Sequence, residues 1–149
     1  MNESTIAVQR ACGVALDRLD TLLCSDKSSG TFGCVDRDFW AYRTLRGFAS
    51  APYQHAMSGL AYLGGMQDEF QRQNLRADVV GVLDFWIRSR NANGSANEWY
   101  RNEQSYCATA MGLHSATETL WVLRNDLSAR DLNHRCEQLR RSELWLRGR

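Results

Sequence analysis

Apolar side chains recur every three or four residues along most of this chain, which is the spacing of one face of an α-helix. A first helix is expected over about residues 4–24, where the polar run of residues 25–30 ends it. A short helix is expected to begin at Asp36 and to end near Gly47. It would offer four side chains for packing: Phe39, Trp40, Tyr42 and Leu45.

The next helical pattern begins at the only proline, Pro52, whose fixed φ favours a first helical turn. Ser50 is placed to cap this helix. Three glycines of the pattern predict close approach by a neighbouring helix: Gly59, Gly64 and Gly65.

Apolar spacing predicts three more helices in the second half of the chain. The first has its apolar positions at residues 75–87 and stops at the polar loop of residues 91–97. The second covers about residues 103–123 and is small or apolar on two sides, so we expect an inner, well-covered helix. The third covers about residues 128–146, and its many arginines indicate a solvated outer helix, with a basic docking face as the alternative.

Five or six helices, with no convincing alternation of period two, predict an all-α protein. Residues 30–63 and residues 93–120 share one plan, with acids and aromatics first and an Ala-Met helix after. Aligning Ala56 with Ala110 gives a repeat of about 54 residues, the size of a helical hairpin with its loop. We therefore expect stacked hairpins in which both segments face one cleft; chance similarity of two Ala-rich helices is the alternative.

A chain of 149 residues, 44% of them hydrophobic, suits one globular domain over residues 1–149. The formal net charge of +1 gives no support for binding to nucleic acid or to a membrane surface. No apolar run reaches the roughly 18 residues of a membrane span, and the first ten residues lack the pattern of a signal peptide. A cytoplasmic location is expected.

Five cysteines without a C-x-x-C pair argue against a disulfide framework and against a compact zinc site. Cys107, His114 and Glu118 could share a helix face, but a packed, hydrogen-bonded histidine is the more common case. The sequence holds no phosphate-binding loop, no G-x-S-x-G and no H-E-x-x-H. No metal and no cofactor are therefore expected.

Carboxylates stand beside aromatic side chains in both repeated segments. Sugars stack on aromatic faces while carboxylates and amides bind their hydroxyls, and glycosidic chemistry needs a general acid and base. The same residue types also serve as helix caps and core aromatics, so both interpretations stand. His55, at the start of its helix, is the histidine best placed for acid–base work. The acids and aromatics concerned are Asp36, Asp38, Trp40, Tyr42, Glu98, Trp99, Tyr100 and Glu103.

The chain resembles the heparinase II/III-like, alginate-lyase-like proteins of bacteria, whose catalytic domain is an (α/α) toroid of helical hairpins. Two segments carry the resemblance: GTFGCVDRDFWAYRTLRGFASAPYQHAMSGLAYL and GSANEWYRNEQSYCATAMGLHSATETL. The second is similar to the family pattern N-E-W-Y-P-N-E-H-S-F-V-A-T. The resemblance implies a partial toroid, either the N-terminal portion of a larger one or a truncated form, with a polysaccharide cleft.

Within that resemblance, Asn102 would stabilise the charge that develops on the substrate, and Tyr106 or His55 would remove the proton. Gln104 stands where the family pattern has histidine, and Arg101 where it has proline. Because glutamine cannot shuttle a proton near neutral pH, activity could be impaired. The substrate-binding positions implied are Asp36, Arg37, Trp40, Tyr42, Glu98, Trp99, Tyr100, Arg101, Glu103 and Gln104.

Two functions are therefore weighed. The first is binding or processing of an acidic, uronate-containing polysaccharide or oligosaccharide by a lyase-type protein, with arginines such as Arg37 and Arg101 pairing to carboxylates. The second is a non-catalytic helical module for protein–protein interaction. The further partners expected are a second copy of the chain or another chain that completes the toroid.

Overall fold

The computed structural model describes residues 3–42, 47–66 and 69–149. Its described residues form six α-helices and no strand, apart from one isolated bridge between Ala96 and Ser105, so the predicted all-α class is confirmed. A short 3-10 helix, η1 at Pro52–His55, precedes the third α-helix. The six helices are α1 Glu3–Asp20, α2 Arg37–Trp40, α3 Ala56–Gly65, α4 Glu69–Ser89, α5 Tyr106–Leu123 and α6 Ala129–Arg147.

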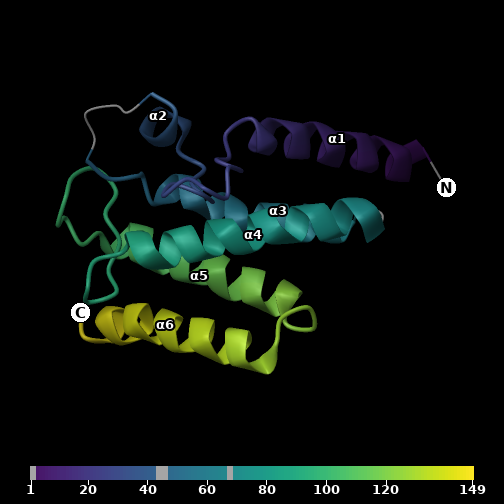
Figure 1. Cartoon of the computed structure of the whole chain (residues 1–149). Coiled ribbons are helices and arrows are strands. Elements are labelled where there is room, and N and C mark those ends of the chain that lie inside the picture. The colour runs from purple at the N-terminus through teal and green to yellow at the C-terminus, as the bar shows by residue number, and fades with distance from the viewer. Residues whose placement is uncertain (1–2, 43–46, 67–68) are drawn as a thin grey trace.

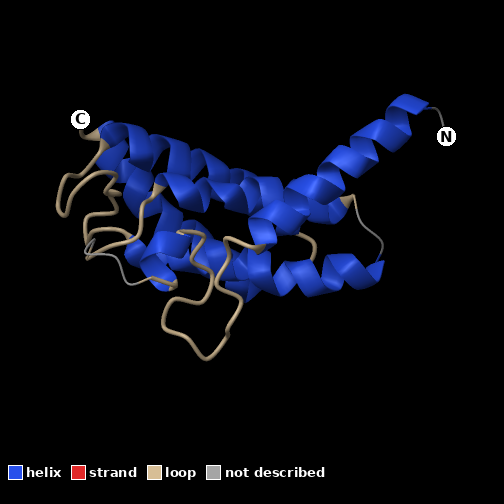
Figure 2. Ribbon diagram, turned by 90° about the horizontal axis from the view of Figure 1, so that it is seen from above, coloured by secondary structure: helices blue, strands red, loops and turns tan. Residues whose placement is uncertain are grey.

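Helices α3 to α6 lie side by side as consecutive antiparallel hairpins (Figure 1). Helix α3 packs against α4 and α5, α5 packs against α6, and α1 contacts α3. The N-terminal half of α1 projects beyond the bundle (Figure 2). The loop between α4 and α5, the start of α3 and the C-terminus lie together at one end of the bundle (Figure 1). None of the described helices is long and apolar enough to cross a bilayer.

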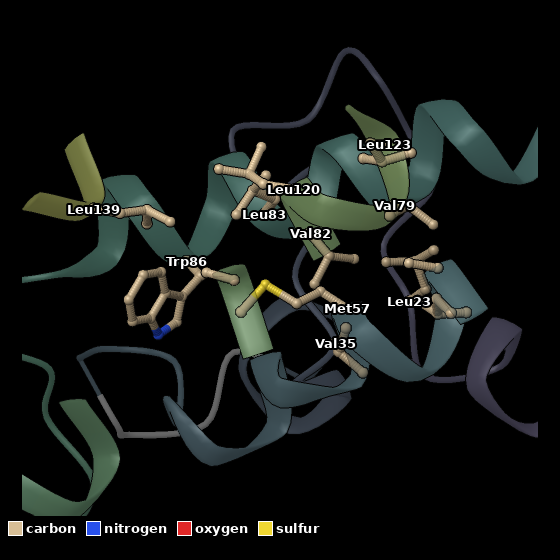
Figure 3. Close-up of a cluster of buried hydrophobic side chains, with 13 residues drawn as sticks. Leu23, Val35, Met57, Val79, Val82, Leu83, Trp86, Leu120, Leu123 and Leu139 are labelled. Atoms are coloured by element: carbon tan, nitrogen blue, oxygen red, sulfur yellow. The ribbon is translucent and has the colours of Figure 1, made fainter. Parts of the chain in front are cut away.

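The main core is formed where α3, α4 and α5 meet (Figure 3). Met57 of α3 and Trp86 of α4 are fully shielded from solvent, and Ala116 of α5 is too. Burial of such apolar surface is the main favourable term in folding. The cluster also contains Leu23, Val35, Leu60, Ala61, Val79, Val82, Leu83, Leu120, Leu123 and Leu139.

Two serine caps fix where the last two helices begin. The Ser128 hydroxyl accepts the Asp131 N–H at 3.1 Å, so α6 begins close to where it was predicted. The Ser105 hydroxyl accepts the Ala108 N–H at 3.1 Å, so α5 begins later than the predicted residue 103. Asn102 and Gln104 have φ of 61° and 56°, and this left-handed backbone cannot continue into a right-handed helix.

The first half of the chain departs from the predictions in three places. Helix α1 ends at Asp20, and α2 ends at Trp40, well before Gly47. The predicted packing residue Leu45 lies outside the described residues. The cap assigned to Ser50 is wrong: no side chain caps η1, and the Ser50 N–H instead donates to the Asp36 carboxylate at 2.9 Å.

Close helix contacts occur at other glycines than those predicted. A Cβ at Gly59 or Gly65 would meet no atom within 4 Å, so the expected close approach is absent there. A Cβ at Gly64 would lie 3.6 Å from the Leu75 side chain, which is an ordinary van der Waals distance. The tight helix contact is at Gly112, where a Cβ would lie 2.5 Å from the Trp86 indole.

The prediction that α5 is an inner helix, well covered by its neighbours, is wrong in part. Met111 and Trp121 are 55% and 62% exposed, because α5 turns its small residues rather than its large ones toward α3 and α4. Thr109 and Thr119 are buried, and each hydroxyl donates to the carbonyl four residues earlier, at 2.6 and 2.8 Å. Such internal hydrogen bonds allow polar side chains to occupy a tight helix interface.

Candidate functional site

The loop of residues 90–105 joins α4 to α5 and is closed by backbone contacts at its base. The Ser105 N–H donates to the Ala96 carbonyl at 2.9 Å, and the Ala96 N–H donates to the Thr109 hydroxyl at 2.8 Å. The side-chain amides of Asn91 and Asn97 form two hydrogen bonds with each other, at 2.9 and 3.1 Å. The loop therefore has a fixed base from which its polar and aromatic side chains project.

Glu103 organises the tip of this loop. One of its carboxylate oxygens accepts the N–H groups of Glu98 and Trp99, each at 2.8 Å. The Trp99 and Tyr100 side chains remain 70% and 64% exposed. The predicted substrate-binding Glu103 thus has a structural task, and it presents two aromatic rings to solvent.

His55, at the end of η1, interacts electrostatically with Glu98 of the loop. Burial lowers the pKa of His55 from its ordinary value of 6.5, while a hydrogen bond to the Ala108 backbone and the charge of Glu98 oppose that shift. The Glu98 carboxylate also accepts the Ser105 hydroxyl at 3.2 Å. The Nε2 atom of His55 is shielded from solvent and has no hydrogen-bond partner among the described residues. His55 is therefore neutral at pH 7, the state that a general base requires.

A hollow of about 460 Å³ opens between the loop and the C-terminal end of α6. The Tyr106 and Trp145 rings form one wall, with centroids 6.4 Å apart and planes tilted by 39°. The Arg149 guanidinium lies 4.8 Å from the centre of the Trp145 ring, as in a cation–π contact. The remaining lining residues are Asn102, Glu103 and Gln104.

Gln104 is hydrogen-bonded to neighbouring side chains. Its side-chain oxygen accepts a hydrogen bond from Asn93 at 3.1 Å and a second one from Arg149 at 3.1 Å. Glutamine is not a proton carrier at neutral pH. In this hollow, proton transfer would therefore fall to Tyr106 or to a group that reaches it from outside.

Tyr106 and His55 lie in different surroundings. Tyr106 contacts Trp145 of α6, whereas His55 contacts Ala108 and faces Glu98. Tyr106 is 59% exposed, but the Nε2 atom of His55 is covered. The structure therefore gives no direct contact between the two candidate bases.

The earlier segment ties α1 to the rest of the fold. Asp36 is buried, caps α2 through the Phe39 N–H at 3.2 Å and binds Ser50. Trp40 donates its indole N–H to the Leu22 carbonyl at 2.8 Å. Four predicted binding residues therefore cluster near the end of α1, with structural partners: Asp36, Arg37, Trp40 and Tyr42.

The two segments nevertheless meet through their later parts. Ala51, Ala96 and Ala108 form one small buried cluster. The Arg101 guanidinium donates to the Gly47 carbonyl, so this predicted carboxylate-binding arginine also has a backbone partner. Residues 47–55 and 96–108 thus share one end of the bundle, whereas no described hydrogen bond or ring contact joins Trp40 or Tyr42 to the second loop.

Trp145 and Arg149 were not predicted from the sequence, where the last helix was expected to be a solvated outer helix. The available signal was a tryptophan among arginines near the end of an amphipathic pattern.

Comparison with family models, with curated proteins and with solved structures gives no match. Within the described ranges, no three His, Cys, Asp or Glu side chains gather in a way that could hold a metal ion.

Proposed function

We propose that the loop end of the bundle binds an acidic, uronate-containing polysaccharide. The observation that carries this proposal is the hollow bounded by Tyr106, Trp145 and Arg149, beside a loop that exposes Trp99. Aromatic faces suit the apolar faces of sugar rings, and a guanidinium pairs with a carboxylate through two parallel hydrogen bonds. An acidic sugar chain combines both features.

The same proposal assigns the helices to part of an (α/α) toroid of the polysaccharide-lyase type. Its support is the succession of antiparallel hairpins α3–α4 and α5–α6 with their functional loop at one end (Figure 1). A second support is the resemblance carried by residues 30–63 and 94–120. In a toroid of this kind, the ends of stacked hairpins supply the walls of the cleft.

Turnover in such a site would be an elimination. A base takes the proton α to the uronate carboxylate, and positive and amide groups stabilise the resulting charge. A C=C bond then forms as the glycosidic C–O bond at the β position breaks, and the departing oxygen takes a proton from the protonated base or from water. Arg149 and Asn102 would stabilise that charge, with Tyr106 or the neutral His55 as the base. The described contacts support binding better than turnover. Gln104 stands where the family pattern has histidine, and the Nε2 atom of His55 is shielded from solvent.

The test combines binding with product formation. The purified chain is applied to a glycan array that includes alginate and heparin-like polymers, and the same polymers are incubated with it while the ultraviolet absorbance of unsaturated uronates is followed. Binding to polyuronates but not to neutral glucans is expected. No binding and no absorbance rise across these polymers would remove the proposal.

A further inference from the structure

A second surface, the groove between α5 and α6, has no role in the polysaccharide proposal. Its volume is about 1100 Å³, and it shares no lining residue with the hollow. Trp121 of α5 and Leu144 of α6 line it and remain 62% and 57% exposed. Contiguous exposed apolar surface marks an interaction site more often than scattered apolar residues do. The other apolar lining residues are Leu113, Leu120, Leu132, Cys136 and Leu139.

Charges alternate along the α6 edge of this groove. Glu137, Arg140, Glu143 and Arg147 follow one another, so the edge carries no net charge. Arg147 pairs with Glu143 at 2.6 Å on the same helix. Glu137 and Arg140 have no ion-pair partner among the described residues. A partner surface with the reverse charge order would pair with both of these exposed side chains.

We propose that the groove binds the same groove of a second copy, which gives a two-fold symmetric dimer. A two-fold axis makes the paired helices antiparallel and repeats every contact twice. With the axis between residues 138 and 139 of α6, Glu137 of each copy lies opposite Arg140 of the other. An identical chain thus supplies the reversed charge order, and its exposed Trp121 and Leu144 supply apolar surface to cover the groove.

The first test is sedimentation velocity of the full chain over a concentration series. The mass is expected to rise from the 17.0 kDa of one chain to twice that value. Leu144→Glu should raise the dissociation constant by about 100-fold, since it places an unpaired charge in apolar groove surface that the second copy would cover. Val14→Glu is the matched control, because Val14 is 71% exposed on α1 and outside the groove. Circular dichroism checks that both variants keep their helices.

The second test is specific to the charge pairing. Glu137→Arg alone and Arg140→Glu alone each place like charges across the axis, and each should weaken dimerisation about tenfold or more. An equimolar mixture of the two variants restores both opposite-charge pairs, so heterodimers should form with nearly the unmodified affinity. A chain that stays monomeric at all concentrations overturns the proposal. So does a dimer that Leu144→Glu leaves intact, or a mixture that stays as weak as its components.

Discussion

The Glu103 carboxylate and the Trp99 N–H are joined by a hydrogen bond of 2.8 Å. The same oxygen accepts the Glu98 N–H at 2.8 Å, so one acid holds two consecutive peptide groups of the loop. Glu103 also lines the hollow between the loop and α6. The exposed aromatic ring of Trp99 and the wall of the hollow therefore depend on the same side chain.

Glu103→Ala should loosen this loop while leaving the helices in place. Two backbone donors lose their acceptor, which should cost about 1–3 kcal/mol in the free energy of unfolding. Amide hydrogen exchange at Trp99 should become faster. Glu103→Gln is the control, because it keeps one acceptor oxygen and should have a smaller effect. Unchanged exchange at Trp99 in the alanine variant would show that the carboxylate does not hold the loop.

Gly112→Ala should destabilise the core by about 1–3 kcal/mol, because overpacking forces neighbouring side chains from their rotamers. Its Cβ would lie 2.5 Å from the Trp86 indole, which is fully buried. Gly59→Ala is the matched change in a helix with open space around it, and it should stabilise the fold by up to about 1 kcal/mol. Urea unfolding of both variants measures the difference. Equal effects at the two glycines would contradict the tight α4–α5 contact.

His55 should make stability depend on pH. Burial lowers its pKa in the folded chain below the 6.5 of a free imidazole, so the unfolded chain binds the proton more readily. The contribution of neutral, buried His55 to the free energy of unfolding is fully present above pH 6.5. It is lost as the pH falls through the pKa that His55 has in the folded chain. When the free energy of unfolding is measured with urea at several pH values, it should fall less steeply on acidification in His55→Gln than in the unmodified chain. His114→Gln is the exposed control, and a loss of the same steepness in all three proteins would contradict the burial of His55.

Arg135 should stabilise the contact between α4 and α6. Its guanidinium binds both carboxylate oxygens of Asp84, at 2.9 and 2.8 Å. Arg135→Lys cannot form the bidentate ion pair and should lower the free energy of unfolding by about 1 kcal/mol. The effect is small because the Asp84 side chain is 41% exposed and solvent screens the pair. Arg130→Lys, an exposed change on the same helix, should leave the unfolding midpoint unchanged. A midpoint shift of equal size in both variants would argue against a specific ion pair.

Most of the helices could be predicted because their apolar spacing records which face is buried. Helix α6 shows this well: it was predicted over about residues 128–146 and is observed at Ala129–Arg147. The start of α5 could not be predicted, because the left-handed backbone at Asn102 and Gln104 has no signature in apolar spacing. The tight contact at Gly112 was also hidden, since it depends on Trp86 of another helix.

The candidate site was predictable only in its local half. The acids and aromatics of residues 97–106 were visible as one loop leading into one helix, and the structure keeps them together. Trp145 and Arg149 reach the hollow because α6 returns antiparallel to α5, a relationship between helices that local pattern does not contain. Asp36 and Trp40 have the residue types of a sugar site, yet their hydrogen bonds anchor loops and the end of α1.

Calorimetric titration with a polyuronate oligosaccharide tests the central claim most directly. The unmodified chain should bind, and Trp99→Ala and Trp145→Ala should each weaken binding by about tenfold through the loss of ring contacts. Tyr62→Ala, which removes an exposed aromatic ring on α3 outside the hollow, should keep the affinity. The absence of any binding heat, or an equal loss of affinity in the Tyr62 variant, would contradict a polysaccharide site at this end of the bundle.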